Sequence, residues 1–341
     1  MRSSVKNILV TGGLGFIGSH TVVELFNAGY QPIIVDNLCN SEESVLSGIE
    51  KIIGTKPVFY KQDFQDKKLL KKIFKDHGID GVIHFAAFKA VGESVEKPLD
   101  YFQNNVVGLV SLLEAIEESN INNLIFSSSC TVYGEPDQLP ITEKSPLKQA
   151  ESPYGATKQM GEVIIADTTK ASLHLRSLSL RYFNPIGAHT SAEIGELPKG
   201  VPENLVPFVT QAAAGLRDEL TIFGDDYPTP DGTCIRDYIH VVDLAKAHVK
   251  SLEYIARQKA GLYDTCNVGT GKGSSVMEVI QTFEKTTGQK VPYKIGPRRS
   301  GDIIQTYAAV DKAEKVLSWK SELSLADALK DAWNWQVKNH K

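Results

Sequence analysis

A tyrosine and a lysine stand four residues apart in the stretch SPYGATK, which runs from Ser152 to Lys158. Residues at i and i+4 share one face of a helix, and Pro153 suits the first turn of one. An ammonium group near a phenol favours the phenolate, so Tyr154 could take a proton from an alcohol. Ser129, at the end of the run NLIFSSS, would offer a short hydrogen-bond path to the same hydroxyl. This pattern predicts alcohol oxidation by hydride transfer.

Nearby charges can supply the free energy that is needed to lower the pKa of such a tyrosine to neutrality. A free tyrosine has a pKa of about 10 and is ionised to roughly one part in a thousand at pH 7. Lowering that pKa by about 3 units takes about 4 kcal/mol, and a cation some 4–6 Å away supplies roughly 3–4 kcal/mol at an effective dielectric of about 20. Lys158 and a positive nicotinamide ring together would suffice. Alone, the YxxxK spacing would indicate an incidental surface pair.

A glycine-rich turn supplies the context that favours catalysis. TGGLGFIGSH follows the first expected strand, and it fits both GxGxxG (Gly13, Gly15, Gly18) and GxxGxxG (Gly12, Gly15, Gly18). Such turns let a backbone approach a pyrophosphate and point a helix N-terminus at it. Asp36 ends the next strand, where a carboxylate binds an adenosine ribose. No cation follows it in DNLCNSEES, which favours NAD over NADP.

Short apolar runs alternate with helical patterns through the first half of the chain. Strands are expected at 7–11, 31–36, 57–63, 81–87, 123–129 and 175–183, and helices at 15–29, 66–77, 100–119 and 154–170. Nearly continuous apolar strands separated by helices predict a parallel sheet covered on both faces. The fold class is therefore α/β, a doubly wound Rossmann sheet. Ligands bind at the carboxyl ends of such strands. Asp63, ending the third strand, could reach the adenine or simply cap the strand.

The alternation of strands and helices ends near residue 185, where glycine and proline become frequent. We expect an NAD-binding domain over residues 1–184 and a smaller mixed α/β substrate domain over 185–341, with some segments able to return to the first domain. ALKDAWNWQVKNHK reads as a final helix with Trp333 on a packed face.

Composition excludes several classes of function. The 341 residues carry a net charge of −4, so no basic field would recruit nucleic acid or an anionic membrane. No apolar run approaches the roughly 18 residues that span a bilayer. The four cysteines (Cys39, Cys130, Cys234 and Cys266) lie far apart, which predicts neither disulfides nor a metal site. The start shows no signal-peptide pattern, so we expect a cytoplasmic protein.

Several motifs resemble those of the extended short-chain dehydrogenase/reductase family, namely TGGLGFIG, SSS followed by YGATK, and RYFNPIGAH. Longer blocks, including HFAAFKAVGESVEKP and DGTCIRDYIHVVDLA, are similar to the UDP-glucose 4-epimerases within it, over essentially the whole length. The resemblance implies that resident NAD takes a hydride from C4 of a UDP-hexose, that the 4-keto sugar turns over, and that the hydride returns to its opposite face. UDP-glucose and UDP-galactose would be interconverted. A homodimer is also implied.

The resemblance assigns roles to individual residues. Tyr154 would be the base for the 4-hydroxyl proton, Lys158 would tune it, and Ser129 would orient the sugar. NAD contacts are implied for Gly12, Gly15, Phe16, Ile17, Gly18, Asp36, Asn37, Asn40, Ser41, Asp63, Phe64, Phe85, Ala86, Ala87, Lys89, Asn104, Tyr154, Lys158, Tyr182 and Phe183. Substrate contacts are implied for Ser129, Tyr154, Asn184, Asn204, Leu205, Thr221, Ile222, Phe223, Arg236, Arg299, Asp302 and Thr306. Forked guanidinium groups at Arg236 and Arg299 suit a diphosphate, with Arg298 an equally plausible neighbour and a surface ion pair the alternative for each.

Other reactions of the same family fit less well. A 4,6-dehydratase would carry an Asp-Glu pair just after the serine segment, where this chain has Cys130-Thr131-Val132. The missing glutamate also disfavours a nucleotide-sugar decarboxylase. A catalytically silent NAD-binding protein would usually lose Tyr154 or Lys158. Epimerisation mainly of UDP-N-acetylglucosamine, or net nucleotide-sugar oxidation, stays open.

The residue near the sugar C2 substituent would decide the substrate range. A bulky tyrosine there tends to exclude an N-acetyl group in the family. Matching RRSGDIIQTYAAVDKA to the family motif puts Thr306 at that position, with Tyr307 beside it. That register leaves room for UDP-N-acetylhexosamines, and a slip by one residue would reverse the inference.

Overall fold

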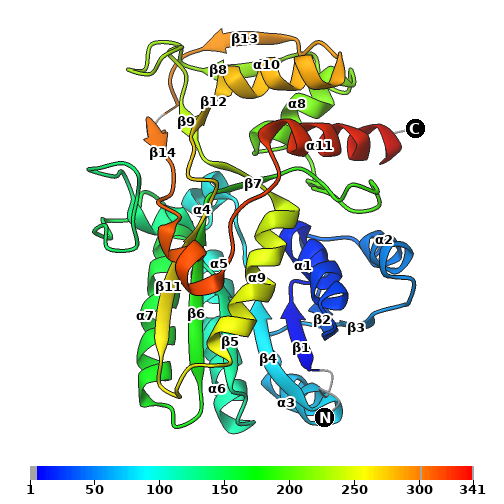
Figure 1. Cartoon of the computed structure of the whole chain (residues 1–341), viewed down its shortest axis with the longest axis vertical. Coiled ribbons are helices and arrows are strands. Elements are labelled where there is room, and N and C mark those ends of the chain that lie inside the picture. The colour runs from blue at the N-terminus through cyan, green and yellow to red at the C-terminus, as the bar shows by residue number, and fades with distance from the viewer. Residues whose placement is uncertain (1–5, 300–301, 340–341) are drawn as a thin grey trace.

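A seven-stranded parallel sheet forms the centre of the larger lobe (Figure 1). The computed structural model describes residues 6–299 and 302–339. The strand order is β11-β6-β5-β4-β1-β2-β3, so the order reverses between β1 and β4, where a doubly wound sheet binds its ligand. The strands are β1 (Asn7–Thr11), β2 (Gln31–Asp36), β3 (Val58–Lys61), β4 (Ile79–His84), β5 (Asn123–Ser127), β6 (Arg176–Tyr182) and β11 (Tyr263–Val268).

Helices cover both faces of this sheet, as the apolar strands require. One face packs against α1 (Phe16–Asn27), α2 (Ser44–Ile53) and α9 (Val241–Ile255), through side chains such as Val22, Ile49 and Leu252. The other face packs against α3 (Lys67–His77), α6 (Gly108–Glu118) and α7 (Pro153–Ala171), through Leu70, Leu112 and others. These two apolar layers bury the sheet and leave only its carboxyl edge for polar groups.

The doubly wound fold expected from the sequence is confirmed, and the six expected strands occur within a few residues of their predicted limits. The helix expected at 100–119 is interrupted. It consists of α5 (Pro98–Phe102), a π-helical turn η1 (Gln103–Val107) and α6. α4 (Val91–Glu96) precedes it, and α2 was not among the expected helices. Such π-turns often mark functional sites, and this one buries Asn104 and Asn105.

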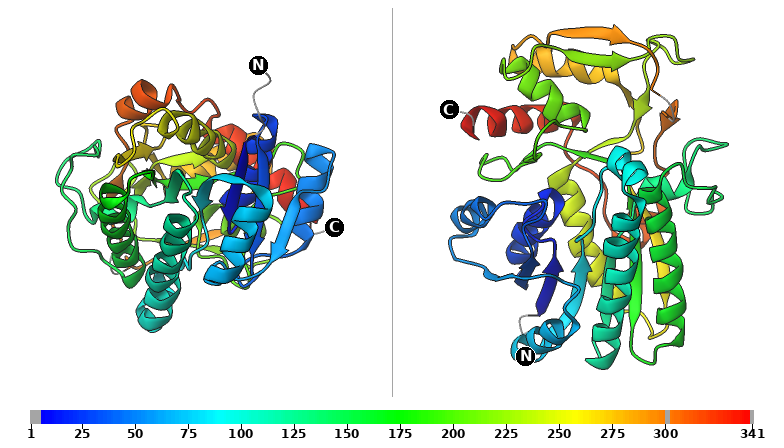
Figure 2. Two further views of the ribbon diagram at one scale, coloured as in Figure 1. Left: turned by 90° about the horizontal axis from the view of Figure 1, so that it is seen from below. Right: turned by 180° about the vertical axis from the view of Figure 1, so that it is seen from behind.

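Three segments from beyond residue 185 lie with the large sheet. β11 pairs with β6 along Tyr263–Val268, α9 packs against α1, and η3 (Ala313–Leu317) packs against α9 and β11. The remaining elements form a smaller lobe above the carboxyl edge of the sheet, as Figure 2 also shows from behind. The domain limits expected from the sequence remain a prediction, and their outer ends, 1–5 and 340–341, lie outside the described residues.

In the part of the chain that the structure describes, the small lobe holds three short sheets and three helices. The sheets pair β7 (Asn184–Ile186) with β10 (Tyr238–His240), β8 (Leu220–Phe223) with β13 (Tyr293–Gly296), and β9 (Ile235–Arg236) with both β12 (Ser274–Ser275) and β14 (Gln305–Thr306). The helices are α8 (Leu205–Ala213), α10 (Val276–Thr287) and α11 (Leu325–Asn339). Trp333 of α11 packs edge-on against Phe283 of α10. η2 (Cys130–Tyr133) and η3 (Ala313–Leu317) complete the chain. Among the described residues, no helix is long and apolar enough to cross a membrane.

Candidate active site

The glycine turn between β1 and α1 is shaped for a phosphate group. Gly12 has φ of 69°, a conformation that favours glycine, and a Cβ there would meet the Ala86 backbone nitrogen at 2.8 Å. A Cβ on Gly18 would lie only 2.2 Å from the Gly12 carbonyl oxygen. Gly15 caps α1 without any side-chain hydrogen bond, so the first N–H groups of the helix stay available to an anion. The turn therefore fits a dinucleotide pyrophosphate.

Asp36 lies at the end of β2, where an adenosine ribose would bind. Its Oδ2 accepts a hydrogen bond from Leu14 N at 3.0 Å, and its Oδ1 accepts from Leu38 N at 2.9 Å and Ser41 Oγ at 2.8 Å. The carboxylate thus ties the glycine turn to the loop after β2. Each carboxylate oxygen has two lone pairs, so Oδ2 keeps one for a ribose hydroxyl.

The other residues proposed for the cofactor surround the same edge. Asp63 accepts a hydrogen bond from Asn37 Nδ2 at 3.0 Å, which joins the loops after β2 and β3. Asn104, in η1, bonds through Nδ2 to Asn105, and Asn105 in turn bonds to Thr157 of α7 at 3.1 Å. Phe16 and Ile17 open α1, Asn40 and Ser41 follow β2, and Phe85, Ala86, Ala87 and Lys89 follow β4. Phe64 is buried, so only its backbone is available to a ligand.

Ser129, Tyr154 and Lys158 converge beyond the end of β5. Ser129 is the N-cap of η2, and its Oγ accepts from Thr131 N at 3.2 Å. Ser152 caps α7 by accepting from Gly155 N at 3.1 Å, which fixes the first turn that carries Tyr154. Lys158 Nζ donates to Ser127 O at 2.7 Å and lies 5.8 Å from the centre of the Tyr154 ring. The sequence therefore located the three groups in one place.

Burial dominates the proton affinities of this pair. It raises the pKa of Tyr154 above the ordinary value, although a hydrogen bond from Ser129 lowers it. Burial also lowers the pKa of Lys158 to about 8, against an opposing effect of Glu162. Lys158 by itself thus does not offset the burial of the phenol. A positively charged nicotinamide ring beside both groups would supply further stabilisation of the phenolate.

Tyr182 and Phe183 lie at the end of β6, beside the catalytic groups. The Tyr182 hydroxyl and Ser127 Oγ are 2.6 Å apart, and both groups are buried. Phe183 is buried in a cluster with Val132 and Tyr133. These two residues form a rigid surface at the position where the nicotinamide is expected.

Two arginines and one aspartate face the site from the small lobe. Arg299 Nη2 donates to Asp302 Oδ1 at 2.7 Å, and Arg236 Nη2 lies 3.7 Å from the same oxygen. Two guanidinium groups share one carboxylate, so the cluster has a net positive charge. The Arg299 guanidinium also stacks 5.5 Å from the centre of the Phe223 ring. Such a cluster suits a diphosphate beside a flat aromatic surface.

The remaining substrate candidates divide into exposed and buried groups. Asn184 Oδ1 is buried without a hydrogen-bond partner among the described residues, which suits a donor on a ligand. Asn204 caps α8 and Leu205 begins that helix, whereas Thr221 lies on β8. Ile222 is buried in the small-lobe core, so only its backbone is available.

Sequence reasoning missed Glu196, which joins the two lobes at this site. Its Oε1 accepts from Asn204 Nδ2 at 2.6 Å and from Lys89 Nζ at 3.4 Å. One carboxylate thus contacts a residue proposed for the substrate and one proposed for the cofactor. Glu196 lies in an irregular loop and shows no periodic pattern that could have identified it.

Comparisons with known proteins agree with this geometry. The family model described as GDP-mannose 4,6 dehydratase matches residues 9–332. The chain is 49% identical to the UDP-glucose 4-epimerase of Yersinia pestis, covering 97% of this chain and 98% of the relative. A 4,6-dehydratase needs the acid pair that is replaced here by Cys130-Thr131 in η2.

Solved structures of UDP-glucose 4-epimerases are also similar to this chain. The UDP-glucose 4-epimerase of Stenotrophomonas maltophilia, with bound NAD and formylated UDP-arabinopyranose, superposes with a TM-score of 0.95 at 49% identity, covering 98% of both chains. The enzyme of Bifidobacterium longum, in complex with NAD+ and UDP, gives 0.93 at 49% identity, covering 98% of this chain and 99% of that one.

Proposed function

This chain belongs to the UDP-glucose 4-epimerases of the extended short-chain dehydrogenase/reductase family, and we propose that Ser129, Tyr154 and Lys158 perform its reaction. It is an isomerase that interconverts UDP-glucose and UDP-galactose with NAD. The observation that carries the assignment of these residues is their convergence at the sheet edge beside the glycine turn.

The geometry suits an acid–base role for each group. Tyr154 accepts the proton of the sugar 4-hydroxyl, and Ser129, whose hydroxyl lies near the phenol, orients that sugar hydroxyl. Lys158 holds its ammonium near the phenol and stabilises the phenolate. NAD, when bound, accepts the C4 hydride and returns it. Tyr154 gives its proton back after the 4-keto sugar has turned over, so the net reaction inverts one carbon.

The nucleotide must stay anchored while the hexose turns. Arg236 and Arg299 hold the diphosphate, and Phe223 offers its ring to the uracil. Fewer and weaker contacts to the hexose let it rotate within the pocket. Binding energy is thereby placed on the part of the substrate that does not react.

The assay that tests this function offers UDP-glucose to the purified protein without added NAD. We expect UDP-galactose to accumulate to an equilibrium mixture, measured by chromatography of the nucleotide sugars. A protein that retains NAD but converts neither sugar would contradict the proposal. A net dehydrogenase would instead need stoichiometric NAD and would accumulate NADH.

We further propose that the pocket accepts UDP-N-acetylhexosamines. Thr306 pairs with Arg236 in the parallel ladder between β14 and β9, so the two side chains point to the same face. Tyr307 points to the other face, where its ring lies 3.3 Å from the position of a Cβ on Gly273. This arrangement supports Thr306, and not Tyr307, as the neighbour of the sugar C2 substituent.

Thr306→Tyr tests this substrate range. We expect the variant to lose at least about ten-fold in kcat/KM for UDP-N-acetylglucosamine, because the larger ring would overlap the N-acetyl group. Its kcat/KM for UDP-glucose should change by less than about three-fold. Parallel assays with both sugars measure the ratio. Equal losses on both substrates would contradict the size argument.

A homodimer is the proposed assembly. Four apolar side chains are exposed by 39–59% on two neighbouring helices. They are Val107 just before α6, Val110 on α6, and Met160 and Val163 on α7. Burying such an apolar stripe against its symmetric copy would stabilise a pair of subunits. Light scattering at micromolar concentration should give twice the chain mass of 37.4 kDa.

The proposed location is the cytoplasm. All four cysteines are free, and Cys234 and Cys266 are buried. Free buried thiols fit a reducing compartment.

A further inference from the structure

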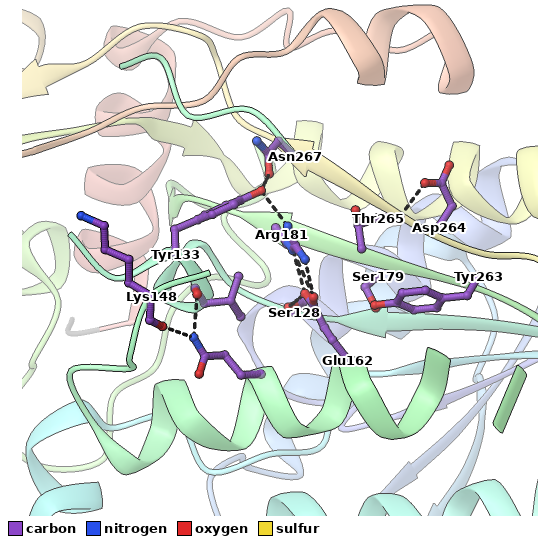
Figure 3. A network of polar contacts seen from close by, with 12 residues as sticks. Ser128, Tyr133, Lys148, Glu162, Ser179, Arg181, Tyr263, Asp264, Thr265 and Asn267 are labelled. Carbon is purple, nitrogen blue, oxygen red and sulfur yellow. Dashed lines mark hydrogen bonds and ion pairs between the residues drawn. The ribbon is translucent and has the colours of Figure 1, made fainter. Parts of the chain in front are cut away.

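A buried ionic network joins α7 to β6 (Figure 3). Arg181 of β6 donates to Glu162 of α7 through both Nε (2.9 Å) and Nη2 (2.5 Å). Ser128 Oγ donates to Glu162 Oε1 at 2.5 Å. The residues Glu162, Arg181 and Ser128 are each 5% exposed or less.

Each member of the network is adjacent to a group of the active site. Glu162 follows Lys158 by four residues on α7, so both lie on one side of the helix. Ser128 lies between Ser127, whose carbonyl accepts from Lys158, and Ser129. Arg181 precedes Tyr182, which bonds to Ser127. The network therefore joins α7, β5 and β6 directly behind the reacting groups.

The fold alone does not call for charges at this place. Nearer the amino end of β6, the same face meets its neighbours through neutral pairs, Ser177 with Thr169 at 2.8 Å and Ser179 with Tyr263 at 3.0 Å. Apolar residues of similar volume often replace buried ion pairs without loss of stability. Among the described residues, the ionic contact of this face of β6, Arg181 with Glu162, lies at the carboxyl end of the strand, beside the active site.

From this arrangement, and resting on the proposed function, we propose that Glu162 is a positioning residue for epimerisation. Its carboxylate, fixed by Arg181 and Ser128 one helical turn beyond Lys158, supplies a negative charge that keeps the ammonium protonated for Tyr154, while the Ser127 carbonyl holds the ammonium itself. Arg181 positions that carboxylate through its rigid fork and reaches on to Tyr133, whose hydroxyl bonds to Asn267 at 2.6 Å.

The charges around Lys158 give Glu162 this role. The Lys158 ammonium lies 5.8 Å from the centre of the Tyr154 ring and interacts electrostatically with Glu162 and His84. The elements packed against α7 also carry Arg181 and Tyr182 on β6, Cys130 on η2, Tyr101 on α5 and Tyr263 on β11. Burial lowers the pKa of His84 to about 3 and raises the pKa of Cys130 and of Tyr182 to about 12, so these groups are neutral near pH 7. Arg181 is cationic and already paired. Glu162 supplies the negative charge that opposes loss of the lysine proton.

The sign of the pH effect follows. Burial lowers the pKa of Lys158 to about 8, so the ammonium is present below that pH and is lost above it. Removal of the Glu162 charge would lower this pKa further. The activating cation would then disappear at a lower pH, and the alkaline limb of the kcat–pH profile would move toward acid.

Glu162→Gln tests the proposal. We expect the alkaline limb of kcat to shift by about one pH unit toward acid, with KM for UDP-glucose changed by less than about two-fold. Glu162→Asp keeps the charge and should restore the limb, at a reduced kcat. Should Glu162→Gln fail to fold, Glu162→Gln combined with Arg181→Met removes both charges and should shift the limb in the same direction by a smaller amount, because loss of the more distant cation partly offsets loss of the carboxylate.

A second measurement does not depend on turnover. The pKa of Lys158 can be followed by NMR of its 13C-labelled ε-carbon in the holoenzyme, with the signal assigned from Lys158→Met. We expect a lower pKa in Glu162→Gln than in the unaltered protein. A shift without epimerase activity in the unaltered protein would overturn the proposed function and leave the role of Glu162 in place.

Asp264→Asn is the matched control. It breaks a neighbouring ion pair, to Lys312 at 2.6 Å, on the edge strand β11. It should leave both the kcat–pH profile and the pKa of Lys158 unchanged. Loss of thermal stability in Glu162→Gln with an unaltered profile and an unaltered Lys158 pKa would overturn the proposal and leave the network a purely structural one.

Discussion

Tyr154→Phe lowers kcat for epimerisation by about a thousand-fold or more, because a positioned general base typically contributes 10²–10⁴-fold and phenylalanine has no group to accept the proton. The ring stays in place, buried to 7% exposure, so the helix that carries Lys158 should keep its position. We therefore expect NAD to remain bound, measured by its release on denaturation. Steady-state assays with UDP-glucose give the rate.

Tyr263→Phe serves as the control for this experiment. Its hydroxyl is also partly buried and also meets a serine, Ser179 at 3.0 Å, but it lies away from the reacting groups. We expect a small loss of stability, on the order of 1 kcal/mol, and kcat within about two-fold of the unaltered protein. If Tyr154→Phe behaved in the same way, another group would have to accept the proton.

The Gly18→Ala variant should lose the cofactor. The added Cβ would lie 2.2 Å from the Gly12 carbonyl oxygen, so the turn that faces the pyrophosphate would have to move. Overpacking against backbone typically costs about 1–3 kcal/mol. We expect the fraction of protein purified with NAD to fall at least about ten-fold, and activity without added NAD to fall with it.

Gly92→Ala is its matched control. Gly92 lies in α4, and its φ is not in the left-handed region. Apart from its chain neighbours and the backbone of its own helix, no atom of the described residues lies within 4 Å of a Cβ built there. Alanine is the better helix former, so stability should rise slightly or stay the same. NAD content and activity should be unaltered. Normal NAD content in Gly18→Ala would show that the turn does not hold the pyrophosphate.

The sequence predicted the parts of this protein that depend on local pattern. Tyr154 and Lys158 were located by helical spacing, and Asp36 by its place after an apolar strand. The glycine turn was found because its geometry restricts residue type at Gly12 and Gly18. Such features need only a few neighbouring residues to be recognised.

Features that depend on distant partners were not predicted. Glu162 and Arg181 are 19 residues apart, and Glu196 contacts Lys89 across 107 residues. β11 reads YDTCNV and its first three residues are only partly buried, so it lacks the apolar run that identified the other strands. The π-turn at Gln103–Val107 was read as continuous helix, since one extra residue barely alters the apolar spacing.

The separation between β14 and the large sheet has a consequence for how such enzymes diverge in evolution. Thr306 belongs to a two-residue strand whose ladder with β9 uses only backbone groups. Tyr154 belongs to a 19-residue helix that packs against the sheet. On the roles proposed for these two residues, mutation at position 306 would change which UDP-sugars are accepted, and the proton acceptor on α7 would be preserved throughout.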